Sequence, residues 1–269
     1  MKTNFIEQNN NSFLISGYEF YKICKWSFCP RYPINYNPNA IQLNDFLFLN
    51  LDYFEQFIHI LTQCEPLNKF ILLTHNSDQK FISQHLNKIK PYISHVYAIN
   101  CGIQDQLVSP IPLGFVDSKY KPHKKFEEIS NKKLEKTILC YMNFAINTNP
   151  IKRQECWNIF VDQDWVYKES NIPSEDFYSQ IIKSKYVLSP EGTGIDCHRI
   201  YESIYFGSIP ILKTSELDYF YKTLPVLIVE TWEEITQNYL ETSYLDLKTK
   251  LDLWIKTNPT WINPTFWIK

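Results

Sequence analysis

One short stretch of the chain gathers residue types that together suit an activated sugar. Residues 189–207, SPEGTGIDCHRIYESIYFG, hold half of the six glycines and carry His198, Arg199 and Glu202 in one expected helix. His198 and Glu202 are four residues apart and share a helical face, with Arg199 three residues before Glu202. A carboxylate can accept both hydroxyls of a ribose, and arginine and protonated histidine can bind a diphosphate. The stretch therefore predicts a pocket for a nucleotide diphosphate-sugar. The alternatives are a surface ion pair between Arg199 and Glu202 and a solvated or core role for His198.

The elements expected around this stretch place it at one edge of a sheet. A buried strand ends near residue 189, a glycine-containing loop follows, and a helix begins near Asp196, its predicted N-cap. Gly207 ends that helix in the left-handed conformation. Loops at the carboxyl ends of parallel strands bind ligands in open α/β sheets, and a helix N-terminus attracts phosphate. We therefore expect donor contacts from the loop as well, although ordinary loop polarity is the alternative for its glutamate: Ser189, Glu191, Gly192 and Gly194.

A second strand–loop–helix unit carries Arg153. The predicted strand 137–143 is followed by a loop and by the helix 150–161, whose Pro150 suits a first turn. Arg153 lies one turn into that helix, so it stands at the same sheet edge as the glycine loop. We predict a phosphate contact for Arg153; the alternative is a solvated position on the helix.

The first half of the chain offers a cluster for a general base. Residues 74–78, THNSD, follow a predicted buried strand and would point into a cleft between two domains. His75 or Asp78 would deprotonate an acceptor hydroxyl there. The alternative is a polar turn in which Ser77 or Asp78 caps the next helix.

Apolar runs alternate with amphipathic stretches along the chain. Predicted strands lie at 45–50, 69–74, 94–100, 137–143, 164–168, 185–189, 208–213 and 226–230, with an extended edge segment at 108–115. Predicted helices lie at 53–64, 79–89, 150–161, 174–183 (capped by Ser174), 196–206 and 216–221. Such alternation predicts parallel sheets covered by helices. The polar segment 117–136 divides the series into an N-terminal αβ domain, 1–125, on the acceptor side and a Rossmann-like donor-binding domain, 126–269, with a helical tail.

Composition limits the class of protein. The 269 residues are 44% hydrophobic with a formal net charge of −2, which favours a packed globular protein over a general duplex-DNA binder. Seven cysteines without a CxxC pair argue against a zinc site and for reduced, buried thiols. Residues 1–13 lack a signal-peptide apolar stretch, and no run approaches the ~20 apolar residues that span a bilayer. We therefore expect a cytoplasmic protein, free or peripheral to a membrane, without nucleic acid.

The stretch 189–212, SPEGTGIDCHRIYESIYFGSIPIL, resembles the signature of exostosin-like glycosyltransferases, S-P-x-G-x-G-x-D-C-H-R-x-x-E-x-x-x-x-G-x-I-P-I. Weaker similarity extends to NFAINTNPIKRQECW, which includes Asn143, and to ILLTHNSD. The resemblance implies a GT-B fold, in which two Rossmann-like domains face a central cleft and the C-terminal domain holds the donor. By this resemblance Glu202 binds the ribose, Arg199 with Arg153 faces the diphosphate, and Asn143 joins the donor site.

The resemblance also implies an activity. The protein would move a sugar from a UDP- or GDP-sugar to a hydroxyl of a glycan, glycoprotein or glycolipid, without a metal or other cofactor. Arg199, Arg153 and the helix N-terminus would stabilise the leaving diphosphate. The chain is short for two full domains, so we expect a reduced N-terminal domain. That shortness motivates a second hypothesis, a nucleotide-sugar or glycan-binding module without turnover. A dinucleotide-dependent enzyme is a third, opposed by the missing G-x-G-x-x-G.

Three other patterns are set aside. Residues 162–164, DQD, form the metal motif of another glycosyltransferase class, but they lie between a helix end and a strand start, at the wrong sheet edge. Cys197 and His198 are neighbours on a helix and point about 100° apart, so they do not form a nucleophile–base pair. Ser189 lacks the G-x-S-x-G elbow of hydrolases.

Overall fold

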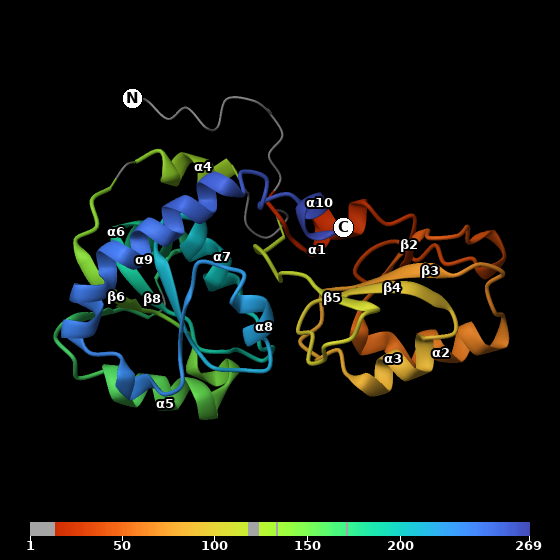
Figure 1. Cartoon of the computed structure of the whole chain (residues 1–269), viewed down its shortest axis with the longest axis horizontal. Coiled ribbons are helices and arrows are strands. Elements are labelled where there is room, and N and C mark those ends of the chain that lie inside the picture. The colour runs from red at the N-terminus through yellow and green to blue at the C-terminus, as the bar shows by residue number, and fades with distance from the viewer. Residues whose placement is uncertain (1–13, 118–123, 133, 171) are drawn as a thin grey trace.

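Two parallel five-stranded sheets divide the chain into two halves (Figure 1). The computed structural model describes residues 14–117, 124–132, 134–170 and 172–269. The first sheet has the order β1-β2-β3-β4-β5, with β1 (Trp26–Phe28), β2 (Phe46–Leu49), β3 (Phe70–Thr74), β4 (Ile93–Ala98) and β5 (Val108–Pro110). The second has the order β10-β9-β8-β6-β7, with β6 (Ile138–Met142), β7 (Val166–Lys168), β8 (Ser184–Leu188), β9 (Ile209–Lys213) and β10 (Leu227–Val229).

Helices lie against both sheets. Those of the first half are α1 (Gly17–Lys22), α2 (Phe54–Gln63) and α3 (Ser83–Ile89), with 3-10 turns η1 (Pro38–Ala40) and η2 (Leu51–Tyr53). Those of the second half are α4 (Lys124–Ser130), α5 (Pro150–Phe160), α6 (Ser174–Lys183), α7 (His198–Tyr205), α8 (Asp218–Tyr221), α9 (Gln237–Thr257) and α10 (Pro264–Trp267), with η3 (Ile146–Thr148) and η4 (Trp232–Glu234).

The first half shows how amphipathic spacing builds the core. Phe54, Phe57 and Leu61 recur on one face of α2 and are buried, and Figure 1 shows α2 and α3 on the same side of the sheet. Only η1 lies between β1 and β2, and residues 101–107 join β4 to β5 without a helix. The N-terminal domain is therefore reduced in its crossover helices, as predicted, while it keeps five strands.

The second half has a doubly wound order with a switch point. Chain order β6, β7, β8, β9, β10 becomes the spatial order β7-β6-β8-β9-β10, so the chain reverses direction across the sheet between β6 and β8. In open α/β sheets the crevice outside the carboxyl ends of strands at such a point is where ligands bind. The loop that follows β6 leads into α5, which carries Arg153, and the loop that follows β8 carries Gly192 and Gly194.

The predicted strands and helices are confirmed, with three local corrections. The helix predicted from residue 79 begins at Ser83, because Phe81 instead forms a bridge with Cys101. Asp196 is not the N-cap of α7, because Cys197 is at that position. The Asp196 carboxylate is buried and accepts a hydrogen bond from Tyr201 OH instead. Ser174 is the first residue of α6 and makes no cap, since Pro173 precedes it at the cap position. Gly207 has φ +70° and ends α7 as predicted.

The sequence patterns missed α1 and β1, which are short elements of six and three residues. Two predictions concern residues outside the described ranges. One is that residues 1–13 carry no signal-peptide apolar stretch, and the other is the part of the expected linker at positions 118–123 and 133. The described part of that linker contains α4, whose Phe126 is fully buried. The division between residues 125 and 126 stays a prediction.

The C-terminal tail packs on the body and also returns to the first half. Trp232 and Trp261 are buried, and Trp254 Nε1 donates to the carbonyl of Thr223 at 2.8 Å. Beyond α9, Ile262 O accepts from the backbone of Ile15 at 2.9 Å. Figure 1 shows α10 beside α1, between the two sheets. The tail thus joins the halves that the sequence assigned to separate domains.

Two further observations concern the class of protein. Across the described ranges, no helix is both long enough and apolar enough to cross a membrane. All seven cysteines are free, and five of them are buried, whereas Cys64 is exposed. The prediction of reduced thiols with mostly structural roles is consistent with this placement.

Candidate functional site

A cavity of about 520 Å³ lies between the two halves, at the carboxyl ends of both sheets. Its N-terminal wall follows β1, β2, β3 and β5 and carries Arg31, Asp52, His75, Asn76, Ser77, Asp78 and Asp117. Its C-terminal wall follows β6 and β8 and carries Arg153, Gly192, Gly194, His198, Arg199 and Glu202. Two Rossmann-like halves facing one cleft make up the GT-B-like architecture predicted from the sequence, so that fold class is confirmed.

Arg153 is almost fully buried, and backbone carbonyls orient its guanidinium. Its Nε donates to the carbonyl of Glu191 at 2.9 Å and its Nη1 to the carbonyl of Ala145 at 2.9 Å, so loops after β8 and β6 both orient it. Its Cζ lies 5.7 Å from the ring centre of Phe144. Burial, together with the nearby charge of Arg199, lowers the pKa of Arg153 to about 10. The guanidinium therefore remains charged at neutral pH. Its burial excludes the alternative of a solvated position on the helix.

Arg199 lies beside Arg153 and is left unsatisfied. Its Cζ is 5.8 Å from the ring centre of the same Phe144. Its Nε and Nη1 are buried and have no hydrogen-bond partner among the described residues. Within that part of the chain, neither Arg153 nor Arg199 forms an ion pair with a carboxylate. A buried cation and a half-buried one without a counter-ion repel each other, and an anion placed between them removes that cost.

Glu202 completes the C-terminal wall one turn further along α7. Its side chain is 3% exposed, and its Oε1 accepts a hydrogen bond from Tyr178 OH at 3.0 Å. Burial and the adjacent Glu202 charge raise the pKa of Tyr178, so its hydroxyl stays a donor. The alternative of a surface ion pair with Arg199 is excluded by these contacts. A buried carboxylate oriented by a hydroxyl suits a ligand that brings further hydroxyl donors.

The two loop glycines are required by close packing rather than by unusual backbone angles. A Cβ on Gly192 would lie 2.9 Å from Nη2 of Arg153. A Cβ on Gly194 would lie 2.8 Å from Nδ2 of Asn100, a residue of the first half. Gly192 therefore makes room for a site arginine, and Gly194 lets the two halves approach.

Three predicted donor contacts do not line the cavity. Asn143 turns back and donates to Tyr141 OH at 2.8 Å. Ser189 is buried at the end of β8, where its Oγ donates to the carbonyl of Val187 at 3.2 Å. The carboxylate of Glu191 pairs with Lys152 outside the cavity, while its backbone carbonyl orients Arg153. Strand-end position alone therefore did not determine which side chains reach the cavity.

Asp196 and Asn100 fasten the two halves together, and sequence reasoning assigned neither to this task. Asp196 Oδ2 accepts from the backbone N–H of Leu113 at 2.9 Å, and its carboxylate also accepts from Tyr201 OH and Tyr221 OH. Asn100 Oδ1 accepts from the backbone N–H of Asp196 at 2.9 Å. Burial raises the pKa of Asp196 against the opposing effect of these hydrogen bonds. The one available signal was the polar Asn100 directly after an apolar strand.

On the N-terminal wall, the predicted bases have different surroundings. His75 is 1% exposed; its Nδ1 lies 2.8 Å from the backbone N of Asn76 and 3.2 Å from Asn76 Oδ1, and its Nε2 is buried. Burial lowers the pKa of His75 to about 4. Asp78 is exposed at the cavity rim. Ser77 Oγ caps a turn by accepting from Gln79 N at 3.0 Å, ahead of α3.

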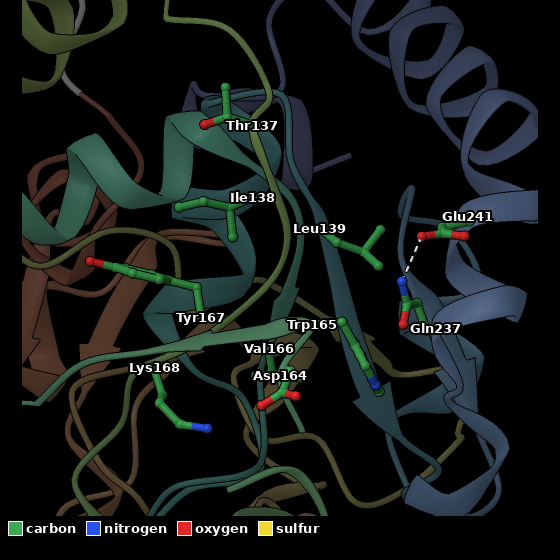
Figure 2. Close-up of a pocket in the computed structure, with 10 residues that line it drawn as sticks. All are labelled: Thr137, Ile138, Leu139, Asp164, Trp165, Val166, Tyr167, Lys168, Gln237 and Glu241. Atoms are coloured by element: carbon green, nitrogen blue, oxygen red, sulfur yellow. Dashed lines mark hydrogen bonds between the residues drawn. The ribbon is translucent and has the colours of Figure 1, made fainter. Parts of the chain in front are cut away.

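A second hollow, of about 560 Å³, lies beside the edge strand β7 and α9 (Figure 2). Gln237 Nε2 and Glu241 Oε1 are joined by a hydrogen bond of 2.9 Å there. Asp164 of the DQD motif lines this hollow, before β7 and therefore at the opposite sheet edge from the site. No group of three metal-ligating side chains occurs in the part of the chain that the structure describes. The charged groups that face one another, among them Arg153, Arg199 and Glu202, line the cavity between the two halves. That cavity is therefore the candidate functional site.

Comparison with known proteins singles out the C-terminal wall. Residues 136–219 match the family model described as the RXYLT1 C-terminal domain. Over 58 residues, the chain is 33% identical to ribitol-5-phosphate xylosyltransferase 1 of Mus musculus and 31% identical to that of Homo sapiens. The aligned stretch covers 22% of this chain and spans only 13% of the length of either relative. The family-model match at residues 136–219 includes Arg153, Arg199 and Glu202. The exostosin-like subclass remains a prediction.

Among solved structures, the chain resembles an α,α-trehalose-phosphate synthase (UDP-forming) from Burkholderia vietnamiensis, with a TM-score of 0.46 and 8% sequence identity. The likeness covers 84% of this chain and 73% of that chain.

Proposed function

We propose that the protein is a glycosyltransferase that takes a sugar from a nucleotide diphosphate-sugar and passes it to a hydroxyl acceptor. The observation that carries the proposal is the pair Arg153 and Arg199, two guanidiniums around one phenyl ring with no carboxylate partner in the described residues. A diphosphate supplies the missing negative charge and the acceptor oxygens for the free N–H groups of Arg199. The match of residues 136–219 to a domain of xylosyltransferases supports the same conclusion.

The donor would occupy the C-terminal wall in a defined direction. Glu202 would accept the ribose hydroxyls on one side of Arg199, and the diphosphate would lie against Arg199 and Arg153. Gly192 would leave room for the Arg153 guanidinium that faces the diphosphate. As the bond to the sugar breaks, charge develops on the diphosphate, and fixed guanidiniums stabilise it without reorganisation. This arrangement needs no resident cofactor; the UDP- or GDP-sugar is a substrate.

The acceptor would enter from the N-terminal wall. That wall carries Asp52, Asp78 and Asp117 beside Asn76 and Ser77, groups that hydrogen-bond to the hydroxyls of a glycan or glycoconjugate. The names of the relatives describe transfer of xylose to ribitol 5-phosphate, so UDP-xylose and ribitol 5-phosphate belong in the first panel of donors and acceptors. A cytoplasmic location, free or peripheral to a membrane, remains a prediction from the sequence.

The test uses the ribose contact, because it separates a nucleotide site from a general anion site. We expect UDP or GDP to raise the thermal unfolding temperature, whereas inorganic pyrophosphate at the same concentration has a smaller effect. Glu202→Gln should weaken binding of the nucleotide about tenfold in calorimetry, the cost of one charge-assisted hydrogen bond. The 2′,3′-dideoxy nucleotide, which lacks both hydroxyls, should bind the wild type and Glu202→Gln equally. A variant with unchanged nucleotide affinity would remove Glu202 from the ribose role.

A binding module without turnover is the second candidate, and the N-terminal wall favours it. Nδ1 of His75 is in contact with Asn76 and its Nε2 is buried, so neither nitrogen of this predicted base is open to an acceptor. Binding of UDP-sugars without UDP release, across donors and acceptors, would establish the module in place of the enzyme.

A further inference from the structure

His198 has the hydrogen-bonding geometry that a general base needs. Its Nδ1 lies 2.7 Å from the carbonyl oxygen of Gly114, in the segment that leads from the first half to the second. A carbonyl only accepts, so Nδ1 carries the ring proton. In the neutral ring the lone pair is therefore on Nε2. A backbone contact across the cleft fixes both the tautomer and the ring orientation.

The lone pair on Nε2 is available to a substrate. His198 is half-buried and lines the cavity, and its Nε2 makes no hydrogen bond to the described residues. Nε2 is not among the buried polar atoms without a partner, so it is accessible to solvent, on a residue that lines the cavity. His75 is the opposite case: its Nδ1 is in contact with the backbone N and the side-chain Oδ1 of Asn76, and its Nε2 is buried.

Neighbouring positions on α7 separate the base from the leaving group. Side chains of adjacent helical residues point about 100° apart. His198 reaches across to Gly114 and lies near His75, whose pKa it lowers. Arg199 turns instead to Phe144 within the C-terminal half. A sugar carbon in the cavity would therefore have a hydroxyl activator on one side and a diphosphate-binding cation on the other.

Resting on the proposed function, we infer that His198 Nε2 is the catalytic base of the transfer. It takes the proton of the acceptor hydroxyl while that oxygen forms a bond to the anomeric carbon. The bond from this carbon to the diphosphate oxygen breaks, and its electron pair leaves with the nucleoside diphosphate beside Arg199 and Arg153. Attack opposite the leaving group inverts the anomeric configuration.

The experiment measures two quantities on the whole chain: UDP affinity by calorimetry, and the rate of UDP release from UDP-xylose, UDP-glucose and UDP-galactose with water as acceptor. His198→Asn keeps an amide N–H near the Nδ1 position, and so keeps a donor for Gly114, but it has no basic nitrogen. We expect UDP affinity within about threefold of wild type and a rate lowered about 10²- to 10⁴-fold. His59→Asn, on the exposed face of α2, is the matched control and should behave as wild type.

A second variant separates a lost base from a disturbed fold. His198→Ala leaves space for a small base, and we expect added imidazole to restore part of the rate. Imidazole should not accelerate the wild type or His198→Asn, in which that space is filled.

Three results would overturn the assignment. A near-wild-type rate in His198→Asn would show that another group takes the proton. Loss of UDP affinity in the same variant would make His198 a donor-binding residue, as the sequence predicted, with the proposed function intact. A wild type that binds neither UDP nor GDP, and releases neither from its sugars, would remove the proposed function and the base together.

Discussion

The two walls of the cavity contain similar residue types, but they treat charge differently. On the N-terminal wall, polar groups hydrogen-bond to one another. Ser77 Oγ donates to Asp52 Oδ1 at 2.6 Å, and Nδ1 of His75 lies 2.8 Å from the backbone N of Asn76. On the C-terminal wall, Arg153 is oriented by backbone carbonyls and Arg199 keeps buried N–H groups without partners. In the described residues, the first wall leaves one neutral ring nitrogen, His75 Nε2, buried without a partner, whereas the second leaves N–H groups of a charged guanidinium that an anion would satisfy.

The unpartnered N–H groups on the C-terminal wall have a free-energy cost that a bound ligand can remove. A buried donor without a partner costs roughly 1–3 kcal/mol, and more for a charged group. The fold tolerates that cost at Arg199, and a ligand that satisfies the guanidinium recovers it. The buried His75 Nε2 also lacks a partner among the described residues, but the ring is neutral at pH 7, so the residues around it should affect stability more than donor affinity.

The largest expected effect comes from removing the unsatisfied cation. Arg199→Ala should lower the rate of UDP release about 10²- to 10³-fold, the usual cost of one preorganised group at a developing charge. Steady-state kinetics with UDP-sugars measure it. Arg31→Ala removes an exposed arginine from the N-terminal wall of the same cavity and should cost far less. Equal losses in the two variants would erase the contrast between the walls.

On the N-terminal wall, His75 should make the stability of the fold sensitive to acid. The folded state holds the pKa of His75 at about 4 by burial, below the ordinary 6.5, so it keeps the ring neutral. The unfolded chain takes up the proton first as the pH falls, and stability is therefore lost between pH 6.5 and 4, by up to about 3 kcal/mol. Urea denaturation at pH 7 and pH 4.5 measures the loss.

His75→Gln has no ring to titrate and provides the control for that measurement. Its stability should vary less over the same pH window, while its UDP affinity at pH 7 should match the wild type. An unchanged pH dependence would assign the acid sensitivity to other groups.

The joint between the walls can be tested at Gly194. Gly194→Ala places a Cβ 2.8 Å from Asn100 Nδ2 and should destabilise the fold by roughly 1–3 kcal/mol, as overpacking does. Because the clash and the lost Asn100 contacts concern the same pair, Gly194→Ala with Asn100→Ala should cost less than the sum of the single variants. Strict additivity in a urea-denaturation cycle would show that the two residues do not meet.

The smallest expected effect is that of a chelator. If Arg153 and Arg199 supply the positive charge at the diphosphate, EDTA should leave UDP release nearly unchanged. Complete loss of the rate, restored by Mn²⁺, would contradict this and return attention to Asp162 and Asp164.

Local pattern carried the sequence analysis a long way. The order of strands and helices, the left-handed Gly207 and the placement of Arg153 after a strand-end loop all follow from spacing within about ten residues. For the same reason the sequence predicted eight residues that do line the cavity: His75, Asp78, Arg153, Gly192, Gly194, His198, Arg199 and Glu202. Their roles in catalysis and binding remain predictions that the variants above test.

The sequence by itself determined two αβ series and the stretch of chain that brings cations and a carboxylate to a strand end. Only the tertiary structure decided which atoms are free. Asn143 and Ser189 turned away because Tyr141 and the Val187 carbonyl satisfy them locally. The tautomer of His198 depends on Gly114, a partner 84 positions away in the chain. Periodicity records burial within one element, whereas a hydrogen bond between distant elements exists only after the halves have packed.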